Sequence, residues 1–442
     1  MRDHRKPKAE SPHDELRDDW FTLSPDERVD AFRALDREEA EDLFLELPTR
    51  DQAELVLTLS PRERRLWVRL LPPDDVADLL LEIPPEDRND VLALLDETTR
   101  REVNALLAYA EDEAGGLMSP WFARVRPDAT VDEAISYLKR QARFHVETIY
   151  YAYVLDAEQR LLGVVSLRQL ITTPGDARVS DVMKTDIVTV REDEDQEAVA
   201  KLLLDQGLMA IPVIDAEERM KGIVTAEDIV DVVEEEATED IQKLGGMEAL
   251  DTPYMSTPFS HMIKKRAGWL TALFVGEMLT ATAMGHYEGE IARAVVLALF
   301  VPLIISSGGN SGSQATTLVI RALALGEVRV RDWWRVIRRE LAAGLALGAI
   351  LGTIGIARIL IWQSVFGTYG EHATLVALTV GLSLIGVVTW GTMMGSLLPF
   401  ILRGLGFDPA SASAPFVATL VDVSGLVIYF TVAGVVLHGK LL

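Results

Sequence analysis

The sequence predicts a multidomain fold with four parts: an all-α superhelical N-terminal domain, an α/β tandem pair, a long connecting helix and an all-α transmembrane domain of five helices. Three observations predict it: a twelve-residue repeat, a duplicated segment and five long apolar stretches. The charges divide the same way, because residues 1–263 hold 59 acidic and 30 basic side chains, whereas residues 264–442 hold 9 and 13. An acidic, water-exposed half therefore precedes an apolar, membrane-embedded half.

Composition excludes several classes of function. The chain has no cysteine, which excludes disulfide scaffolds, thiolate metal sites and cysteine nucleophiles. Its net charge of −25 argues against nucleic-acid binding, which needs basic surface to neutralise phosphates. Residues 1–19 lack the apolar core of a signal peptide, so we expect a disordered N-terminus and a cytoplasmic acidic half.

A twelve-residue repeat predicts a helical-repeat domain over residues 20–115. An apolar residue recurs at every twelfth position, followed within two residues by Pro or Asp: Leu23, Leu35, Leu47, Leu59, Leu71, Ile83 and Leu95. Each unit is predicted to be a short amphipathic helix that ends in a Pro- or Asp-led turn. Because such units cannot bury their own apolar faces, we expect them to stack into a superhelix.

A second repeat indicates a duplicated domain, since residues 154–171 match residues 213–230 at an offset of 59. Each copy is predicted as strand, turn, strand and helix, and a further helix precedes each copy, at 132–143 and 195–206. Met118 and Met183 open the two copies. We place the copies at 116–180 and 181–235.

The segment at 227–263 is predicted to be an acidic connecting helix followed by a linker to the membrane. Its acids crowd together: Glu234, Glu235, Glu236, Glu239 and Asp240. Like charges one helical turn apart repel one another. Hard divalent cations with oxygen ligands, Mg²⁺ or Ca²⁺, are the natural counter-charge. We therefore predict that cations draw the acidic domains together and that this helix transmits the change to the membrane.

Five apolar stretches are each long enough to cross a hydrocarbon core of about 30 Å. We place them at about 268–286, 291–312, 339–363, 373–400 and 412–437. The loop between the second and third stretches is rich in arginine, whereas the loop between the third and fourth has no Lys or Arg. The positive-inside rule then predicts a membrane domain over 264–442 with its N-terminus inside and its C-terminus outside.

Asp422 is the main functional candidate within these stretches. A carboxylate at membrane depth is costly, and small residues adjoin it at Ala418 and Gly425. We interpret Asp422 as a pore ligand for a hydrated cation; the alternative is a carboxylate held by a hydrogen bond from a neighbouring helix. For Glu277, a partner role within the membrane and a functional role stay equally open.

A polar stretch at 306–317 is the second candidate. Pro302 and a Gly–Gly pair are expected to break the second span and to free backbone carbonyls that line a cavity. Asn310 and Gln314 would share one helical face. The alternative is a polar helix end at the cytoplasmic surface. Four glycines between 344 and 355 are predicted to serve ordinary helix packing.

These features together resemble the MgtE magnesium channels and transporters, and the duplicated segment resembles a tandem pair of CBS domains. The resemblance covers nearly the whole chain, and its specific motifs are P-x5-GGN-x-G-x-Q (302–314) and LVDVSG. It implies a homodimer in the cell (inner) membrane, with a pore between the two membrane domains. It also implies that the helix at 227–250 plugs the pore.

The resemblance further implies roles for individual residues. Asp422 would be the pore Mg²⁺ ligand beside Ala418 and Gly425, and the pore signature comprises Pro302, Gly309, Asn310, Gly312 and Gln314. The sensing residues would be Asp42, Asp74, Gly116, Asp195, Glu197, Asp228, Asp231, Glu236, Glu239 and Asp240. A regulatory ATP would contact Arg168. Two positions depart from the family pattern: Gln169 replaces a ribose-binding Asp, and Gly207 replaces a further sensing acid.

The predicted function is a Mg²⁺-selective channel for uptake that closes when intracellular Mg²⁺ is high. The chain is predicted not to be an enzyme, and transport would run down the membrane potential, which contributes about 2.3 kcal/mol per charge per 100 mV. Two alternatives stay open. One is a CBS-regulated channel or carrier for Co²⁺, Mn²⁺ or a different solute, and the other is a membrane-anchored nucleotide sensor without a pore.

Overall fold

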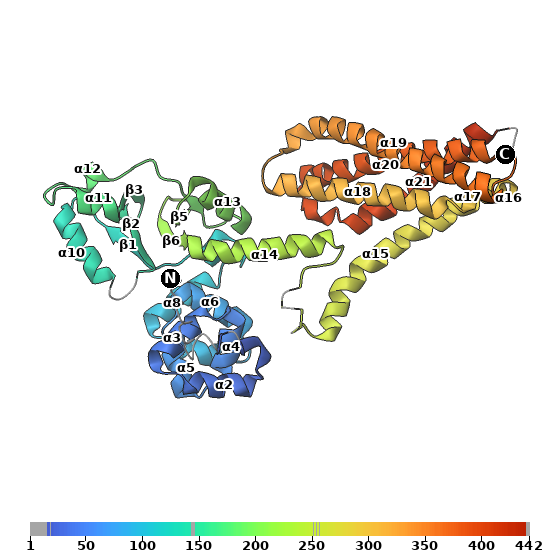
Figure 1. Ribbon diagram of the computed structural model, residues 1–442. Helices are drawn as coiled ribbons and strands as arrows, with labels where there is room; N and C mark the ends of the chain where they lie inside the picture. The colour runs from blue at the N-terminus through green and yellow to red at the C-terminus, as the bar shows by residue number, and fades with distance from the viewer. Residues whose placement is uncertain are drawn as a thin grey trace, which may run out of the picture. The chain divides into compact units, whose positions relative to one another are not determined.

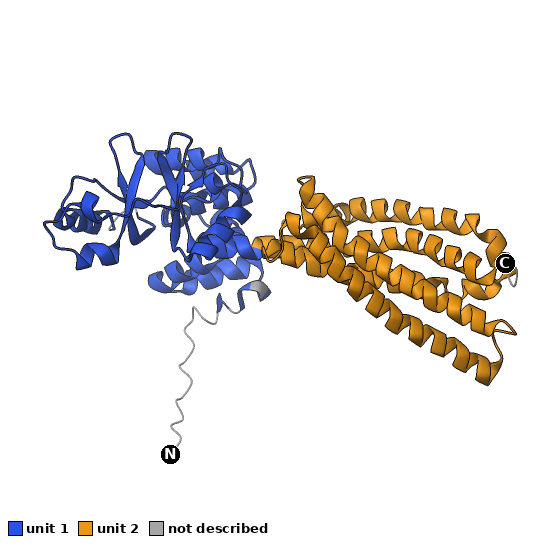
Figure 2. Cartoon of the chain, turned by 90° about the horizontal axis from the view of Figure 1, so that it is seen from above, with its two compact units in different colours: residues 1–234 blue, residues 235–442 orange. Residues whose placement is uncertain are grey.

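The computed structural model describes residues 16–17, 19–142, 146–250, 252, 254–255 and 257–438. The predicted disordered N-terminus lies almost entirely outside the described residues. The chain forms two compact units, residues 1–234 and 235–442 (Figure 2). The division falls within one long helix, and each unit is described here by itself.

The N-terminal part of the first unit is a stack of short helices (Figure 1). They are η1 (Trp20–Thr22), α2 (Pro25–Ala34), α3 (Arg37–Glu46), α4 (Thr49–Thr58), α5 (Pro61–Val68), α6 (Pro73–Glu82), α7 (Arg88–Leu92) and α8 (Glu97–Leu106). The twelve-residue repeat explains the stack, because Leu47, Leu59 and Ile83 end α3, α4 and α6 and are buried. Ser24 and Ser60 begin α2 and α5 as capping boxes.

The remainder of the first unit holds two similar three-stranded sheets. The first copy comprises β1 (Phe122–Val125), α10 (Val131–Gln141), β2 (Thr148–Leu155), β3 (Leu161–Ser166) and α11 (Leu167–Thr172). The second comprises α12 (Val179–Val182), β4 (Val190–Arg191), α13 (Gln196–Gln206), β5 (Ala210–Ile214) and β6 (Met220–Thr225). In each sheet the first pair of strands is parallel and the second pair is antiparallel. The predicted order of elements is therefore confirmed.

The opening segments of the two copies are exchanged. Ser119, which follows Met118, pairs with Ile223 of the second copy, and Lys184, which follows Met183, pairs with Val164 of the first. A side chain at Gly222 would collide with Met118, and one at Gly163 would collide with Met183. The two copies therefore fold as one interlocked body.

Among the described residues, the second unit contains five helices long and apolar enough to span a membrane. They are α15 (Phe259–His286), α18 (Val301–Ala324), α19 (Trp333–Phe366), α20 (Ala373–Gly404) and α21 (Ala414–Leu437). The short elements α16 (Glu288–Arg293), α17 (Val295–Ala298), η2 (Val330–Asp332) and η3 (Pro409–Ser411) connect them, and α9 (Ala114–Leu117) and α14 (Ala226–Leu244) complete the chain. Glycines 344, 348, 352 and 355 of α19 pack against α20, as predicted for ordinary helix packing.

The expected break in the second span is wrong. Residues 306–317 lie inside the continuous helix α18, and Pro302 sits in its first turn. Proline is tolerated there because the N–H groups of a first turn have no partner within the helix. The adjacent glycines serve close packing instead, since a side chain at Gly308 would meet Val387 and Val421. The alternative of a helix end within this stretch is also excluded, because α18 runs on to Ala324.

Candidate functional site

Acidic side chains from three segments meet within the first unit. Asp74 and Asp75 lie in the first turn of α6, Glu147 precedes β2, and Asp228 lies in the first turn of α14. The Ser119 hydroxyl lies 3.1 Å from Asp74 Oδ1 and 3.2 Å from Glu147 Oε2, which ties the helical stack to the first sheet. We call Asp74, Asp75, Glu147 and Asp228 the acidic junction.

Burial and mutual repulsion raise the pKa values throughout the acidic junction. Burial, followed by the charges of Glu147 and Asp75, raises the pKa of Asp74 well above its usual value. Burial, followed by the charges of Glu147 and Asp228, raises the pKa of Asp75 to about 7. Burial raises the pKa of Asp228 to about 6, although two hydrogen bonds from Thr225 oppose this shift. Carboxylates in this state gain from any cation that neutralises them.

Asp231, one turn beyond Asp228, extends the junction. Burial and the charges of Glu234 and Glu227 raise its pKa. Among the described residues, no three His, Asp or Glu side chains are arranged as a ready-made metal site. The junction is thus a group of closely interacting carboxylates rather than a preformed cage. It suits a hydrated ion held by one or two carboxylates at a time, which is how proteins commonly hold Mg²⁺.

The other predicted sensing residues of the first unit lie elsewhere. Asp42 is exposed on α3. Asp195 caps α13 by accepting hydrogen bonds from the backbone of Glu197 and Ala198. Gly116 lies in α9, where a side chain would run into the backbone of Ala110. Asp195 therefore serves as a helix cap, and position 116 leaves no room for a side chain.

The sensing acids of the second unit lie along the C-terminal half of α14. Glu236 and Asp240 are half-buried, and Glu239 pairs with Lys243 one turn later. The Lys243 ammonium also donates to Asp408 Oδ2 at 2.7 Å, which joins α14 to the connection between α20 and α21. Burial lowers the pKa of Lys243, but the bonds to Asp408 and Glu239 raise it overall. This lysine therefore stays charged, and the contact persists at neutral pH.

Asp422 is half-buried in α21, close to α18. A side chain at Gly309 would lie 3.6 Å from Asp422 Oδ1 and 3.4 Å from Ala418 Cβ, so Gly309 leaves the carboxylate uncovered on that side. Within the described residues, no group donates a hydrogen bond to the Asp422 carboxylate, so no bond from a neighbouring helix holds it there. Gly425 is buried and faces Val387 of α20.

Glu277 is a second acid within the apolar helices and lies on α15. It lines an open groove of about 510 Å³ between α15 and α21, together with Thr271, Phe274 and Thr419. Sequence reasoning left the role of Glu277 open, and the groove places its carboxylate with Thr419, which lies three residues before Asp422 in α21.

The signature residues of α18 divide between two faces. Gly309 and Gly312 are buried against α21 and α20, whereas Asn310 and Gln314 are exposed at the predicted i, i+4 spacing. The Asn310 amide lies 3.5 Å from the Ser306 hydroxyl. An exposed polar face on a membrane-spanning helix is unfavourable in lipid, so it needs water or protein against it.

The two departures from the family pattern have local explanations. Gln169 accepts hydrogen bonds from Ser166 in a capping box at the start of α11, beside the exposed Arg168. Gly207 ends α13 with φ +62°, a left-handed conformation that favours glycine. Both positions therefore carry a structural requirement.

Sequence reasoning missed four residues of the acidic junction and of the contact between α14 and the membrane helices: Asp75, Glu147, Lys243 and Asp408. Asp75 was visible only as the neighbour of Asp74, and Glu147 lies in a connection with no repeat or motif. Lys243 and Asp408 are 165 positions apart, so no spacing could have paired them. The only available signal was the opposite sign of two isolated charges near the ends of helices.

Three sequence families match the chain. The divalent cation transporter MgtE matches residues 301–432, the MgtE intracellular N domain matches 14–112, and the CBS domain matches 114–174 and 179–235. The magnesium transporter MgtE of Thermus thermophilus is 43% identical over 336 residues, covering 76% of this chain and 72% of that protein. That of Enterococcus faecalis is 36% identical over 332 residues, covering 75% and 70%.

The chain belongs to the MgtE family. It is therefore a membrane protein of a magnesium transporter family, with cytosolic N-terminal domains, and not a member of an enzyme family. An inosine-5'-monophosphate dehydrogenase of Methanocaldococcus jannaschii matches only 24% of the chain. The alternatives of a different transported solute and of a nucleotide sensor without a pore are not favoured by these relatives.

Two solved structures each align with about half of the chain. The cytosolic domain of the Mg²⁺ channel MgtE in complex with ATP is 41% identical and covers 51% of this chain and 91% of that one, with a TM-score of 0.48. The soluble part of a magnesium transporter is 30% identical, with coverage of 51% and 93% and a TM-score of 0.41.

Proposed function

We propose that this MgtE-family protein is a Mg²⁺ channel that intracellular Mg²⁺ closes through the acidic junction. The observation that carries the proposal is the meeting of Asp74, Asp75, Glu147 and Asp228, with raised pKa values and no basic partner among the causes of those shifts. A divalent cation would relieve their repulsion. All the donors are carboxylate oxygens, which suits Mg²⁺ rather than zinc.

Helix α14 supplies the connection from sensor to gate. Its first turn carries Asp228, and its last turn carries Lys243 in contact with Asp408. At 1.5 Å per residue, its 19 residues correspond to about 28 Å of continuous helix. In this proposal, ion binding at the first turn acts through the helix on the last turn, where Lys243 contacts Asp408.

The proposed ion pathway runs along the polar face of α18, past Asn310 and Gln314, to Asp422. We propose that two copies of the chain place these faces against each other, because a polar face needs water or protein in the membrane. The N-terminal domains would lie in the cytoplasm, the C-terminus outside, and the protein in the cell inner membrane.

Nucleotide binding is a secondary part of the proposal. An ATP complex is described for the cytosolic domain of a homologous Mg²⁺ channel. In this chain Arg168 offers an exposed cation at the start of α11, but Gln169 supplies no carboxylate for a ribose hydroxyl. We therefore expect ATP to adjust the Mg²⁺ response rather than to be required for it.

Mg²⁺ flux into vesicles that contain the purified protein tests the pathway and the sensor separately. We expect Asp422→Ala to lower the flux more than about tenfold, because it removes the carboxylate that attracts the ion. The control Glu288→Gln, on exposed α16, should leave the flux unchanged. Unchanged flux through the Asp422 variant would refute the assigned pathway.

The sensor is tested by the quadruple variant Asp74→Asn, Asp75→Asn, Glu147→Gln, Asp228→Asn. Removing the repulsion removes the need for a cation, so we expect the Mg²⁺ concentration that half-closes the channel to change at least several-fold. The control Asp26→Asn, Glu38→Gln alters two exposed acids of the helical stack. An identical midpoint in the quadruple variant would exclude the junction as the sensor.

A further inference from the structure

The connection into α19 carries an exposed basic surface that the proposed transport function does not use. Trp333 and Trp334 are 45% and 57% exposed at the start of the helix. Five exposed arginines surround them: Arg329, Arg331, Arg335, Arg338 and Arg339. We call these seven residues the basic interfacial patch.

Helical spacing gathers part of the patch on one face. Within α19, Arg335 and Arg338 are three residues apart and Trp334 precedes Arg338 by one turn, whereas Arg331 lies in η2 immediately before the helix. The same face continues along α19 with Leu341 and Leu345, which are 38% and 49% exposed. An apolar, outward-facing helix surface thus leads directly into a cluster of cations and indole rings.

None of the five arginines forms an ion pair within the described residues, although Glu340 directly follows Arg339. Within the part of the chain that the structure describes, no carboxylate lies within ion-pair distance of any of the five guanidinium groups. Two acids lie beside these arginines in the sequence, Asp332 and Glu340, and Asp332 accepts from the backbone N–H of Arg329 at 3.1 Å. Five exposed arginines against two acids leave the patch positively charged, so it would attract an anion from outside the chain.

We propose that the basic interfacial patch binds anionic phospholipids, with their phosphate headgroups on the arginines and their acyl chains along Leu341 and Leu345. Arginine presents a fork of N–H donors that matches phosphate. Tryptophan is favoured where hydrocarbon gives way to headgroups. A free phosphate would use the arginines alone, whereas a lipid uses the arginines, the indole rings and the leucines, all of which are exposed here.

Native mass spectrometry of the full-length protein, released from nanodiscs of equal phosphatidylglycerol and phosphatidylcholine, tests the proposal without any measurement of Mg²⁺ transport. The test variant is Arg331→Gln, Arg335→Gln, Arg338→Gln. Each basic residue near an anionic surface contributes about a fivefold preference, so the bound phosphatidylglycerol-to-phosphatidylcholine ratio should fall more than about tenfold. The matched control Arg62→Gln, Arg65→Gln, Arg100→Gln changes exposed arginines of the helical stack equally and should keep the ratio.

Further measurements separate charge from folding and lipid from free phosphate. The variant Arg331→Lys, Arg335→Lys, Arg338→Lys should retain most of the preference, and circular dichroism should show equal helix content in all variants. Glycerophosphoglycerol, which has the headgroup without acyl chains, should fail to displace the lipid.

An unchanged lipid ratio in the glutamine variant would overturn the proposal. Displacement by glycerophosphoglycerol would also overturn it and would assign a phosphate site instead. An unchanged lipid ratio with new protease sites in the acidic half would assign the patch to a protein contact.

Discussion

Asp228 performs two tasks with one carboxylate. It accepts the Thr225 N–H at 2.8 Å and the Thr225 hydroxyl at 2.9 Å, which begins α14, and it belongs to the acidic junction. The equivalent residue of the first copy, 59 positions earlier, is Gln169, which makes the same contacts to Ser166 without a charge. The second copy thus gains a negative charge while keeping its helix cap.

The raised pKa values predict how stability depends on pH. Asp75 and Asp228 have native pKa values of about 7 and about 6, above the value of an unfolded Asp near 4. The native state therefore binds more protons between pH 4 and pH 7, and its free energy of unfolding falls as the pH rises through this range. Without divalent cations, we expect the melting temperature at pH 8 to be several degrees lower than at pH 5.

Added Mg²⁺ should restore most of that loss at pH 8 and little at pH 5, because protons and cations compete for the same carboxylates. Differential scanning fluorimetry with and without Mg²⁺ measures both effects. The Asp75→Asn, Asp228→Asn variant provides the comparison, since it should flatten the pH dependence. An equally steep dependence in this variant would show that other groups cause it.

At the scale of elements, α14 is fastened to the second unit at its last turn. Lys243 bonds to Asp408, and the partly buried Leu244 packs against the cluster that contains Ile320, Ala410 and Ala412. The turn that follows is equally tight, because a side chain at Gly246 would meet Trp269 and Pro415. The Lys243–Asp408 ion pair, which we call the latch, and the apolar contacts of Leu244 thus hold the last turn of α14.

The Lys243–Asp408 latch can be tested by charge reversal. We expect Lys243→Asp to weaken closure and to raise the Mg²⁺ flux at inhibitory Mg²⁺ several-fold, because two carboxylates would then face each other. The double variant Lys243→Asp, Asp408→Lys should restore closure. Vesicle flux at low and high internal Mg²⁺ measures both. If the double variant leaks as much as the single one, the pair does not act as a latch.

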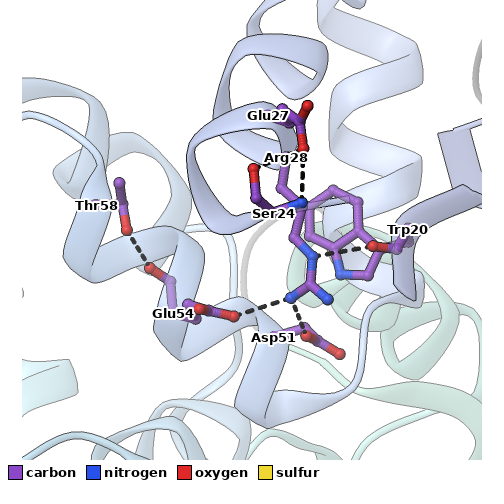
Figure 3. A network of polar contacts seen from close by, with 7 residues as sticks. All are labelled: Trp20, Ser24, Glu27, Arg28, Asp51, Glu54 and Thr58. Atoms are coloured by element: carbon purple, nitrogen blue, oxygen red, sulfur yellow. Dashed lines mark hydrogen bonds and ion pairs between the residues drawn. The ribbon is translucent and has the colours of Figure 1, made fainter. Parts of the chain in front are cut away.

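Arg28 fastens neighbouring helices within the stack (Figure 3). Its guanidinium bonds to Asp51 at 3.0 Å and Glu54 at 2.9 Å on α4, donates to the Trp20 carbonyl at 2.9 Å, and lies 5.4 Å from the centre of the Trp20 ring. The Arg28 and Asp51 side chains are only 15% and 13% exposed. The contacts are therefore poorly screened by water.

Removal of Arg28 should destabilise the helical stack measurably. Arg28→Ala leaves Asp51 and Glu54 without their cation, and we expect the free energy of unfolding to fall by about 2 kcal/mol. The control Arg33→Ala breaks an exposed pair with Glu63 and should cost clearly less, because water and salt screen exposed ion pairs. Urea denaturation compares the two, and equal losses would contradict the proposed importance of burial.

At the scale of the whole molecule, the polar face of α18 predicts a second copy. The chain contains no cysteine, so a single introduced cysteine reports one position without background. We expect Gln314→Cys to form a disulfide-linked dimer in membranes under mild oxidation. Ile354→Cys should not form such a dimer, because Ile354 is 59% exposed on an apolar face of α19. Non-reducing electrophoresis distinguishes the outcomes, and a monomeric Gln314 variant would argue against a pore between two copies.

The sequence by itself determined the order of the parts and the kind of chemistry. Periods of 12 and 59 residues and five apolar runs are local properties, so they predicted the helical stack, the duplicated sheets and the number of spans. The predicted bounds of the second span were wrong because proline and paired glycines break a helix in some contexts and are accommodated within one in others. In α18, proline occupies the tolerated first turn and the glycines provide close packing against α20 and α21.

Only the tertiary structure decided which acids act together. Sequence spacing could not relate Asp74, Glu147 and Asp228, because they come from three segments and meet only when the helical stack packs beside the interlocked sheets. It likewise could not pair Lys243 with Asp408 or place Gly309 beside Asp422. The physical reason is that burial and electrostatic interaction depend on distance through space, which for residues far apart in the chain follows from packing and not from local periodicity.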